Sequence, residues 1–233
     1  MIDIHCHLLY GVDDGAEDRQ MSVEMLKHAA GQGIRRVIFT PHYRQGMFKY
    51  PLDKIMAAYE DIKVEAEKLG MMSYLGCEYH ADGCTGENFK CGRCLTLADS
   101  EYVLVEFKYE SSIGFIRNTL YDLFASGYTP VIAHAERYGV FIKDPGILRE
   151  LRDMGVSVQI NAGSVLGREG FKTKRLCKRI IKDHLVDIVA SDSHNMTDRK
   201  NHMKECYEYI AKRYGEGRAE RLFCTNPWKI LEK

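Results

Sequence analysis

Residues 1–15 read MIDIHCHLLYGVDDG, an apolar run that carries two histidines two positions apart and then two aspartates. In an extended strand, residues i and i+2 point to the same side with Cα atoms about 6–7 Å apart, so His5 and His7 can reach one ion. The same spacing recurs in SDSH at 191–194, where Asp192 and His194 are two positions apart. Both stretches predict metal ligands at the end of a strand.

Short apolar runs alternate with segments of helical period along the rest of the chain. Strands separated by helices of this size predict right-handed β-α-β units and a parallel sheet. The runs are apolar almost throughout, which is typical of a sheet covered on both faces. The pattern predicts an α/β fold with a closed, barrel-like sheet, and a doubly wound open sheet is the alternative. The seven runs are residues 2–6, 35–40, 71–77, 102–107, 129–134, 156–161 and 186–191, and the helical segments are 18–33, 51–70, 116–127, 145–155 and 173–184.

Polar side chains stand at or just beyond the end of each apolar run. Parallel strands present their carboxyl ends at one edge of the fold, where α/β proteins place their sites. Any single histidine among them is explained equally well as a hydrogen-bonded core residue. A whole set of polar side chains at one shared end of apolar strands instead indicates a functional site. These residues are His5, His7, His42, Glu78, Glu106, His134, Asn161, Asp192 and His194.

Histidine, aspartate and glutamate ligands suit Zn, Mn, Fe or Co, and the absence of a thiolate cluster argues against a purely structural zinc site. With Asp14 added, the set is too large for one ion, which predicts two or three divalent metals. A carboxylate can bridge two ions through its two oxygens, and Glu78 or Asp192 is the natural candidate for this role. Clustered metals favour hydrolysis at phosphorus, because they acidify a bound water and clamp the attacking and leaving oxygens.

Two arginines follow the strand-end histidines closely: Arg137 is three residues past His134, and Arg199 is five past His194. A guanidinium fork can hold two phosphate oxygens at once, so both are candidates for binding substrate phosphate. An ordinary surface salt bridge is the alternative for each.

The composition argues against some classes of protein, and it includes one cysteine motif whose role the sequence does not decide. Thirty-three basic and thirty-three acidic residues give a formal net charge of zero, which argues against nucleic acid or an anionic membrane as the main partner. Neither a secretory signal nor a bilayer-spanning stretch is visible, so we expect a cytoplasmic protein without membrane insertion. Among the eight cysteines, Cys91 and Cys94 form one C-x-x-C, which could be half of a zinc site or a redox pair.

With these residues in place, the chain resembles the polymerase-and-histidinol-phosphatase (PHP) superfamily. It most resembles the bacterial manganese-dependent protein-tyrosine phosphatases of capsular and exopolysaccharide operons. The matching pieces run in order along the chain: MIDIHCHLLYGVDDGAEDRQMS, TPHYRQGMF, GCEYH, LTLADSEYVLVEF, TPVIAHAERY, QINAGSVLG, ASDSHN and TNPWKIL.

The resemblance implies one PHP phosphatase domain over residues 1–233, folded as a distorted seven-stranded β/α (TIM-like) barrel with a trinuclear metal centre. It implies manganese, with iron, zinc and cobalt as alternatives, and phosphate-binding roles for Arg137 and Arg199. Carried over by position, the metal ligands are His5, His7, Asp14, His42, Glu78, Glu106, His134, Asp192 and His194.

The expected function is a metal-dependent phosphomonoesterase that hydrolyses protein phosphotyrosine through a metal-bound hydroxide. The resemblance implies that its partner is a bacterial tyrosine kinase with a Tyr-rich tail that controls capsular or extracellular polysaccharide synthesis. A histidinol-phosphate phosphatase with the same centre is the closest alternative, and a non-catalytic, metal-bound scaffold protein is a further one. The native metal, the substrate protein, the general acid, the oligomeric state and the role of Cys91 and Cys94 stay open at this point.

Overall fold

The computed structural model describes residues 1–48 and 50–232, and Lys233, the last residue of the expected domain, lies outside them. All strand pairs are parallel, as predicted, and they form two sheets. The first sheet has the order β1 (Ile2–Asp3), β2 (Arg36–Phe39), β4 (Met72–Leu75). The second has the order β3 (His42–Tyr43), β5 (Glu78–His80), β6 (Tyr102–Glu106), β7 (Thr129–Ile132), β8 (Ser157–Asn161), β9 (Ile188–Ala190).

The α/β class is therefore confirmed, but the count of seven strands is not, because the described residues contain nine strands. Two predicted runs each continue into a second short strand. Pro41, which has no N–H for a ladder, separates β2 from β3, and Gly76 lies between β4 and β5. A Cβ at Gly76 would lie only 3.0 Å from Leu97 Cδ2, so the chain bends closely against its neighbour there.

Backbone hydrogen bonds continue across these breaks. Gly76 N donates to Phe39 O at 2.9 Å, and Glu78 N donates to Pro41 O at 3.2 Å. At the other edge, an isolated parallel bridge joins Cys6 to Ser193. The strand order runs in one direction in each sheet, without the reversal that marks a doubly wound sheet, so the described strands do not support that alternative.

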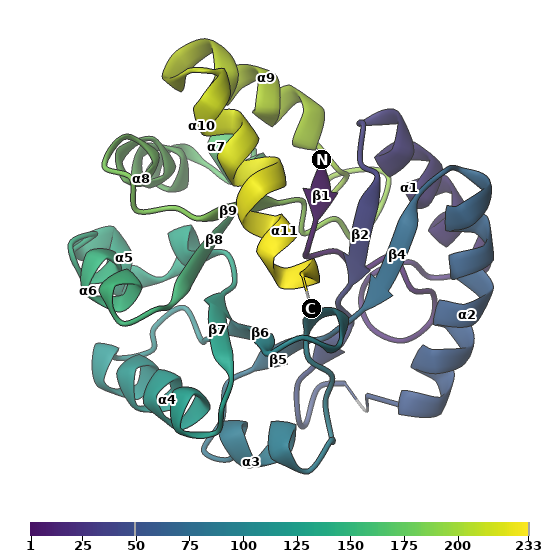
Figure 1. Ribbon diagram of the computed structural model, residues 1–233, viewed down its shortest axis with the longest axis horizontal. Coiled ribbons are helices and arrows are strands. Elements are labelled where there is room, and N and C mark those ends of the chain that lie inside the picture. Colours follow the sequence, from purple (N-terminus) through teal and green to yellow (C-terminus); the bar gives the residue numbers. More distant parts are fainter. Residues whose placement is uncertain (49, 233) are drawn as a thin grey trace.

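Helices surround the strands (Figure 1) and include all five segments predicted from helical period. Side-chain caps explain where two of them begin: Asp18 Oδ1 accepts from Met21 N at 2.9 Å, and Ser112 Oγ accepts from Phe115 N at 3.2 Å. The helices are α1 (Arg19–Gly31), α2 (Leu52–Lys68), α3 (Thr85–Lys90), α4 (Ile113–Ala125), α5 (Gly139–Lys143), α6 (Ile147–Asp153), α7 (Ala162–Leu166), α8 (Phe171–Lys182), α9 (Met203–Tyr214), α10 (Glu216–Glu220) and α11 (Asn226–Leu231).

The apolar strands bury both of their faces, as the sequence predicts. In β6, Val103 and Val105 belong to the larger core cluster, which includes the buried side chains of the surrounding helices, whereas Leu104 belongs to a second cluster with Val131. Ile230 of α11, the helix that crosses in front of the strands in Figure 1, joins this second cluster. Full burial of such a side chain contributes about 1.5–3 kcal/mol.

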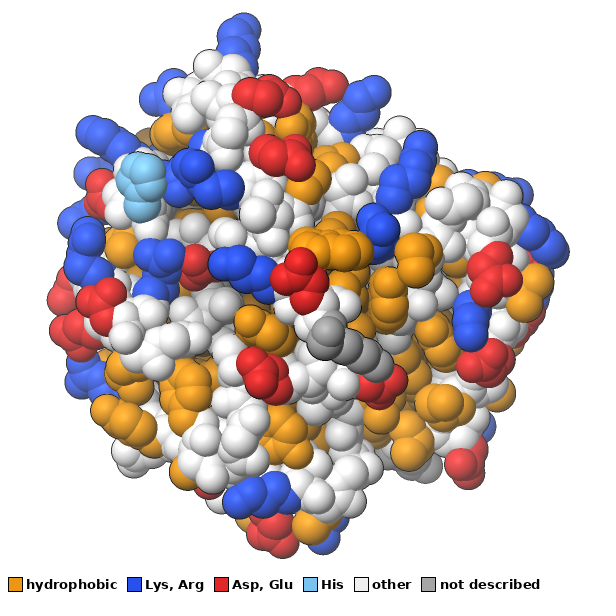
Figure 2. All heavy atoms as spheres, in the orientation of Figure 1, with side chains coloured by type: hydrophobic (Ala, Val, Ile, Leu, Met, Phe, Trp, Pro, Cys, Tyr) orange, Lys and Arg blue, Asp and Glu red, His pale blue; other side chains and the backbone are white. Residues whose placement is uncertain are grey.

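Charged side chains of both signs are interspersed over the face shown in Figure 2, in keeping with the balanced composition. Within residues 1–48 and 50–232, no helix has the length and apolar character needed to cross a bilayer.

Candidate metal centre

The nine residues predicted to bind metal lie together at the carboxyl ends of the strands. His5 and His7 follow β1, His42 and Glu78 open β3 and β5, and Glu106 ends β6. His134 follows β7, Asp192 and His194 follow β9, and Asp14 lies in the loop after β1. All are buried except Asp14, whose side chain is 49% exposed.

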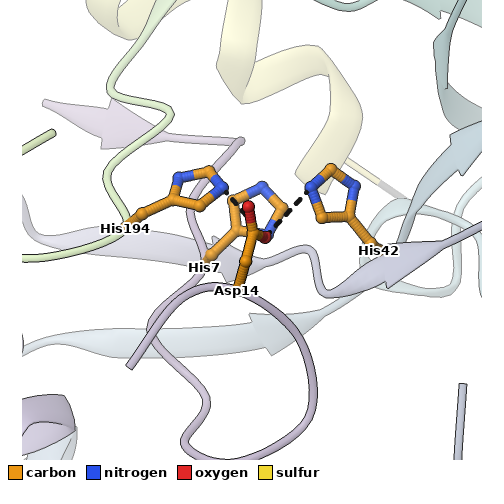
Figure 3. Close-up of side chains that lie close together, drawn as sticks. All are labelled: His7, Asp14, His42 and His194. Atoms are coloured by element: carbon orange, nitrogen blue, oxygen red, sulfur yellow. Dashed lines mark ion pairs between the residues drawn. The ribbon is translucent and has the colours of Figure 1, made fainter. Parts of the chain in front are cut away.

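One group of four donors surrounds the carboxylate of Asp14. His7, Asp14, His42 and His194 each offer a ligand atom, and these four atoms lie within 4.8 Å of one another. Figure 3 shows the imidazoles of His42 and His194 on either side of Asp14, whose Oδ1 lies 3.4 Å from His42 Nε2 and 3.5 Å from His194 Nε2. Three imidazoles and one carboxylate make a donor set that suits a divalent metal.

Two further groups share residues with the first. His5, His7, Glu78 and Asp192 form one, and His42, Glu78 and Glu106 form the other. Glu78 is common to both: its Oε2 lies 3.2 Å from His5 Nε2 and from His7 Nε2, and 3.0 Å from His42 Nδ1. This geometry suits the bridging role predicted for Glu78.

His134 lies outside these three groups but contacts the same carboxylates. Its Nε2 is 2.8 Å from Glu78 Oε1 and 3.8 Å from Glu106 Oε2. His134 and Asp192 also have left-handed backbone conformations, with φ of 32° and 49°. Such conformations cost about 1–3 kcal/mol in residues other than glycine and concentrate at functional sites.

The electrostatics of the cluster favour positive charge inside it. Burial alone would raise the pKa of Glu78, but His5 and His42 hold it well below its usual value. Burial also opposes ionisation of Asp192, yet Arg137 and His5 hold its pKa well below normal. Both groups are therefore carboxylates that require a cation nearby.

The histidines provide the complementary donors. Burial, together with the neighbouring His7, lowers the pKa of His194 to about 4, which leaves its ring neutral at neutral pH. His194 Nε2 and His42 Nδ1 are buried and make no hydrogen bond of good geometry among the described residues, although each lies within 3.5 Å of a carboxylate oxygen, of Asp14 and of Glu78 respectively. Ionised carboxylates and unpartnered imidazole nitrogens fit divalent metal ions as ligands.

Asp13 holds part of the centre in place, a role that the sequence did not reveal. Its Oδ2 lies 2.7 Å from His7 Nδ1 and accepts from His42 N at 3.0 Å, while its Oδ1 accepts from Gly15 N at 2.9 Å. A carboxylate on one ring nitrogen directs the other nitrogen of the histidine toward a metal. The adjacent Asp13 and Asp14 thus have different surroundings, and their spacing alone could not distinguish them.

A chain of amides on β8 positions three more members. Gln159 Oε1 accepts from His134 N at 2.8 Å and lies 3.2 Å from His5 Nδ1. Gln159 Nε2 donates to Asn161 Oδ1, and Asn161 Nδ2 donates to Asp192 Oδ2, at 2.8 and 2.7 Å. Asn161, found by the strand-end pattern, therefore supports a predicted ligand, and Gln159 was missed because it lies inside the strand.

Arg137 and Arg199 both lie against Asp192. Arg137 Nη1 is 2.9 Å from Asp192 Oδ2, and Arg199 Nη2 is 3.2 Å from Asp192 Oδ1. Arg137 also donates from Nε and Nη2 to the two carboxylate oxygens of Glu169, at 2.7 and 2.9 Å. Both arginines line a cavity of about 370 Å³ that reaches Asp192. They thus stand where an anion would approach the cluster. The salt bridge that is the alternative role for these arginines is also present for Arg137, with Glu169.

The C-x-x-C motif does not form a paired site. Cys91 is exposed and Cys94 is buried, where the neighbouring Cys77, together with burial, raises the pKa of the Cys94 thiol. None of the metal-ligating groups in the described residues contains a cysteine. The described residues thus give no support to a zinc site or a disulfide at this motif.

Comparisons with known proteins agree with this geometry. The family model for capsular polysaccharide synthesis, CpsB/CapC, matches residues 1–232. Tyrosine-protein phosphatase CpsB of Streptococcus pneumoniae is 36% identical over 238 residues, which cover 99% of this chain and 98% of that protein. Tyrosine-protein phosphatase YwqE of Bacillus subtilis (strain 168) is 35% identical over 217 residues, which cover 92% of this chain and 85% of that protein.

The fold agrees as well. A crystal structure from a study of YwqE from Bacillus subtilis and CpsB from Streptococcus pneumoniae, described there as metal-dependent tyrosine phosphatases, superposes with a TM-score of 0.92. It is 33% identical in sequence, and the match covers 99% of this chain and 94% of that one. The resemblance seen in the sequence is confirmed, and the chain belongs to the CpsB/CapC family of capsular polysaccharide synthesis.

Proposed function

We propose that this protein is a metal-dependent phosphomonoesterase that hydrolyses phosphotyrosine in proteins. The observation that carries the proposal is the set of three overlapping His/Asp/Glu groups, which share His7, His42 and Glu78. Relatives that match nearly the whole chain are tyrosine-protein phosphatases, which supports the same substrate class.

The proposed ligands are the nine predicted residues, which would hold two or three divalent ions, with manganese favoured over iron, zinc and cobalt. Bound ions of this kind acidify water and neutralise charge on phosphoryl oxygens. The donor chemistry supports this assignment, because four carboxylates and five imidazoles meet in one cluster that is buried except for Asp14. The ligands are His5, His7, Asp14, His42, Glu78, Glu106, His134, Asp192 and His194.

Arg137 and Arg199 have the proposed role of binding the non-bridging oxygens of the phosphoryl group. Preorganised cationic donors stabilise the charge that these oxygens carry in the transition state. Asp192 lies within 3.3 Å of both guanidinium groups, and Glu169 holds Arg137 through two hydrogen bonds. These carboxylates orient the forks toward the cavity that both arginines line.

No side chain is assigned as a general acid. The phenol of tyrosine has a reference pKa of about 10, well below that of an aliphatic alcohol. Its phenolate therefore leaves more readily than an alkoxide and places less demand on a proton donor.

Two finer features belong to the proposal. Residues 1–233 would form one PHP phosphatase domain, and its two sheets would act as one distorted seven-stranded barrel; the hydrogen bonds across Pro41 and the bridge between Cys6 and Ser193 support this. The partner would be a bacterial tyrosine kinase with a Tyr-rich tail, acting in polysaccharide synthesis. The family description, capsular polysaccharide synthesis, supports that partner.

Phosphate release from a phosphotyrosine peptide and from histidinol phosphate, measured side by side with manganese-loaded protein and a chelator control, tests the function. We expect the peptide to be strongly preferred and chelator to abolish turnover. Preference for histidinol phosphate would overturn the substrate but keep the centre. Folded, metal-bound protein that hydrolyses neither compound would indicate the non-catalytic scaffold instead.

A further inference from the structure

A second, larger cavity opens beside the metal centre. Its volume is about 660 Å³, and its walls come from three parts of the chain. These are Arg44–Met47 after β3, His80–Gly83 at the end of β5, and Lys108, Ser111 and Ser112 after β6 together with Phe115 in the first turn of α4. His80 joins the cavity to the centre, because it lines the cavity while its Nδ1 lies 3.0 Å from Glu106 Oε1. We call this cavity the flanking cleft.

The flanking cleft has cations that the protein itself does not neutralise. Arg44 and Lys108 line it, and neither lies within 4.0 Å of a carboxylate among the described residues. The acidic residue of the lining, Asp82, is already engaged, since it accepts hydrogen bonds from Tyr79 Oη and Cys84 N, both at 2.8 Å. The walls therefore carry two cations against one carboxylate, and this excess of positive charge faces a ligand.

The same cleft also offers apolar contact and an unused polar atom. Met47 and Phe115 are 61% and 37% exposed, which is high for such large apolar side chains. His80 Nε2 is buried and has no hydrogen-bond partner among the described residues. Apolar walls with a few polar groups are the usual lining of a ligand site, and this volume lies within the usual range of about 300–1,000 Å³.

We propose that the flanking cleft binds the residues next to the phosphotyrosine of the substrate and selects segments that carry acidic side chains. The proposal rests on the proposed function, since it assigns the substrate's main chain to a path that leads away from the metal centre past His80. Arg44 and Lys108 would pair with the acidic side chains, and Met47 and Phe115 would cover apolar atoms of the peptide. A small phosphate ester would leave the flanking cleft empty, so its residues contribute only to peptide substrates.

The test compares three substrates: a phosphotyrosine peptide with glutamates on both sides of the phosphotyrosine, the same peptide with glutamines, and para-nitrophenyl phosphate. For the unaltered protein we expect kcat/KM to be about fivefold higher for the glutamate peptide, because two exposed ion pairs each contribute modestly. The double variant Arg44→Ala/Lys108→Ala should lose this preference. Its turnover of para-nitrophenyl phosphate should stay at the level of the unaltered protein.

Lys200→Ala is the matched control, because Lys200 is a lysine on the wall of the other cavity, beside Arg199. This variant should keep the preference for glutamate. Loss of the preference in Lys200→Ala but not in the double variant would overturn the proposal and place the peptide over the other cavity. The proposal is also overturned if the unaltered protein does not distinguish the two peptides.

Two further readouts separate the causes of a failure. The charge-conserving variant Arg44→Lys/Lys108→Arg should retain the preference, which shows that charge and not loop structure carries the effect. Failure of the unaltered, metal-loaded protein to hydrolyse any of the three substrates would contradict the proposed function itself. Normal turnover of para-nitrophenyl phosphate without peptide selectivity would contradict only the role of the flanking cleft.

Discussion

Arg137 Nη1 lies 2.9 Å from Asp192 Oδ2, while the Nε and Nη2 atoms of the same guanidinium donate to Glu169. One arginine is thus shared between a proposed metal ligand and a second carboxylate. Burial lowers the pKa of Arg137, but Asp192 and Glu169 more than offset this and raise it well above its usual value. Arg137 therefore stays charged and directed at the opening of the centre.

Replacing Arg137 by alanine should lower kcat/KM for a phosphotyrosine peptide on the order of 10²-fold, the usual effect of removing one preorganised donor from a site of this kind. The metal content should stay close to that of the unaltered protein, because none of the nine proposed ligands changes. Steady-state kinetics and elemental analysis of the same preparation measure both quantities. Arg117→Ala is the control, since Arg117 pairs with Glu150 at the surface and neither kcat/KM nor metal content should change.

If Arg137→Ala lost its metal, Arg137 would instead be a support for Asp192. The variant Arg137→Lys separates the two roles further. Lysine keeps the charge beside Asp192 but lacks the planar fork that binds two phosphate oxygens. We expect Arg137→Lys to keep its metal and to lose most of the activity that Arg137→Ala loses.

Asp13→Asn should weaken metal binding by about 10–100-fold, the usual cost of losing a carboxylate partner of a ligating histidine. Asp13 Oδ2 lies 2.7 Å from His7 Nδ1, and an asparagine there either loses the interaction or reverses its donor. Metal titration of the chelator-treated variant measures the change. Asp18→Asn is the matched control: it makes the same chemical change at the N-cap of α1, where asparagine caps as well as aspartate. An unchanged affinity in Asp13→Asn would mean that His7 does not bind metal through Nε2.

Much of this centre could be predicted from the sequence, because most of its residues lie at the carboxyl ends of strands. Parallel strands bring their carboxyl ends together, so a polar residue that closes an apolar run belongs to one site wherever it lies in the chain. His134 and Asp192 are 58 positions apart in the sequence, and each follows its strand at the same end of the fold.

The rest of the fold and of the site depends on contacts that no local sequence pattern specifies. The runs at 35–40 and 71–77 continue into β3 and β5 because Pro41 and Gly76 interrupt the ladders without ending the hydrogen-bond path. Glu169 lies in a loop before α8 and reaches Arg137 only through the folded chain. A pair 32 positions apart has no signature in spacing or composition.

Removal of metal should abolish turnover and lower the thermal stability of the protein. Ions that bind the folded chain but not the unfolded one stabilise it by about 2.7 kcal/mol when their free concentration is 100 times Kd. The buried carboxylates Glu78 and Asp192 would also lose a compensating charge. Melting curves with chelator and with added manganese measure this difference. Equal melting temperatures would argue against ligation by the buried cluster, since a site of these residues cannot be emptied without consequence.

Gly15→Ala should disrupt the centre without touching a proposed ligand. A Cβ at Gly15 would lie 2.1 Å from His7 O and 2.6 Å from His7 Cβ, distances that the backbone cannot accommodate without moving. The loop that carries Asp13 and Asp14 would shift away from His7, so we expect a large loss of metal affinity and of activity. Gly217→Ala is the control, because no atom lies within 4 Å of a Cβ there and alanine is the better helix former. Normal metal content and turnover in Gly15→Ala would show that the loop after β1 tolerates displacement, and Asp14 would then have no place among the ligands.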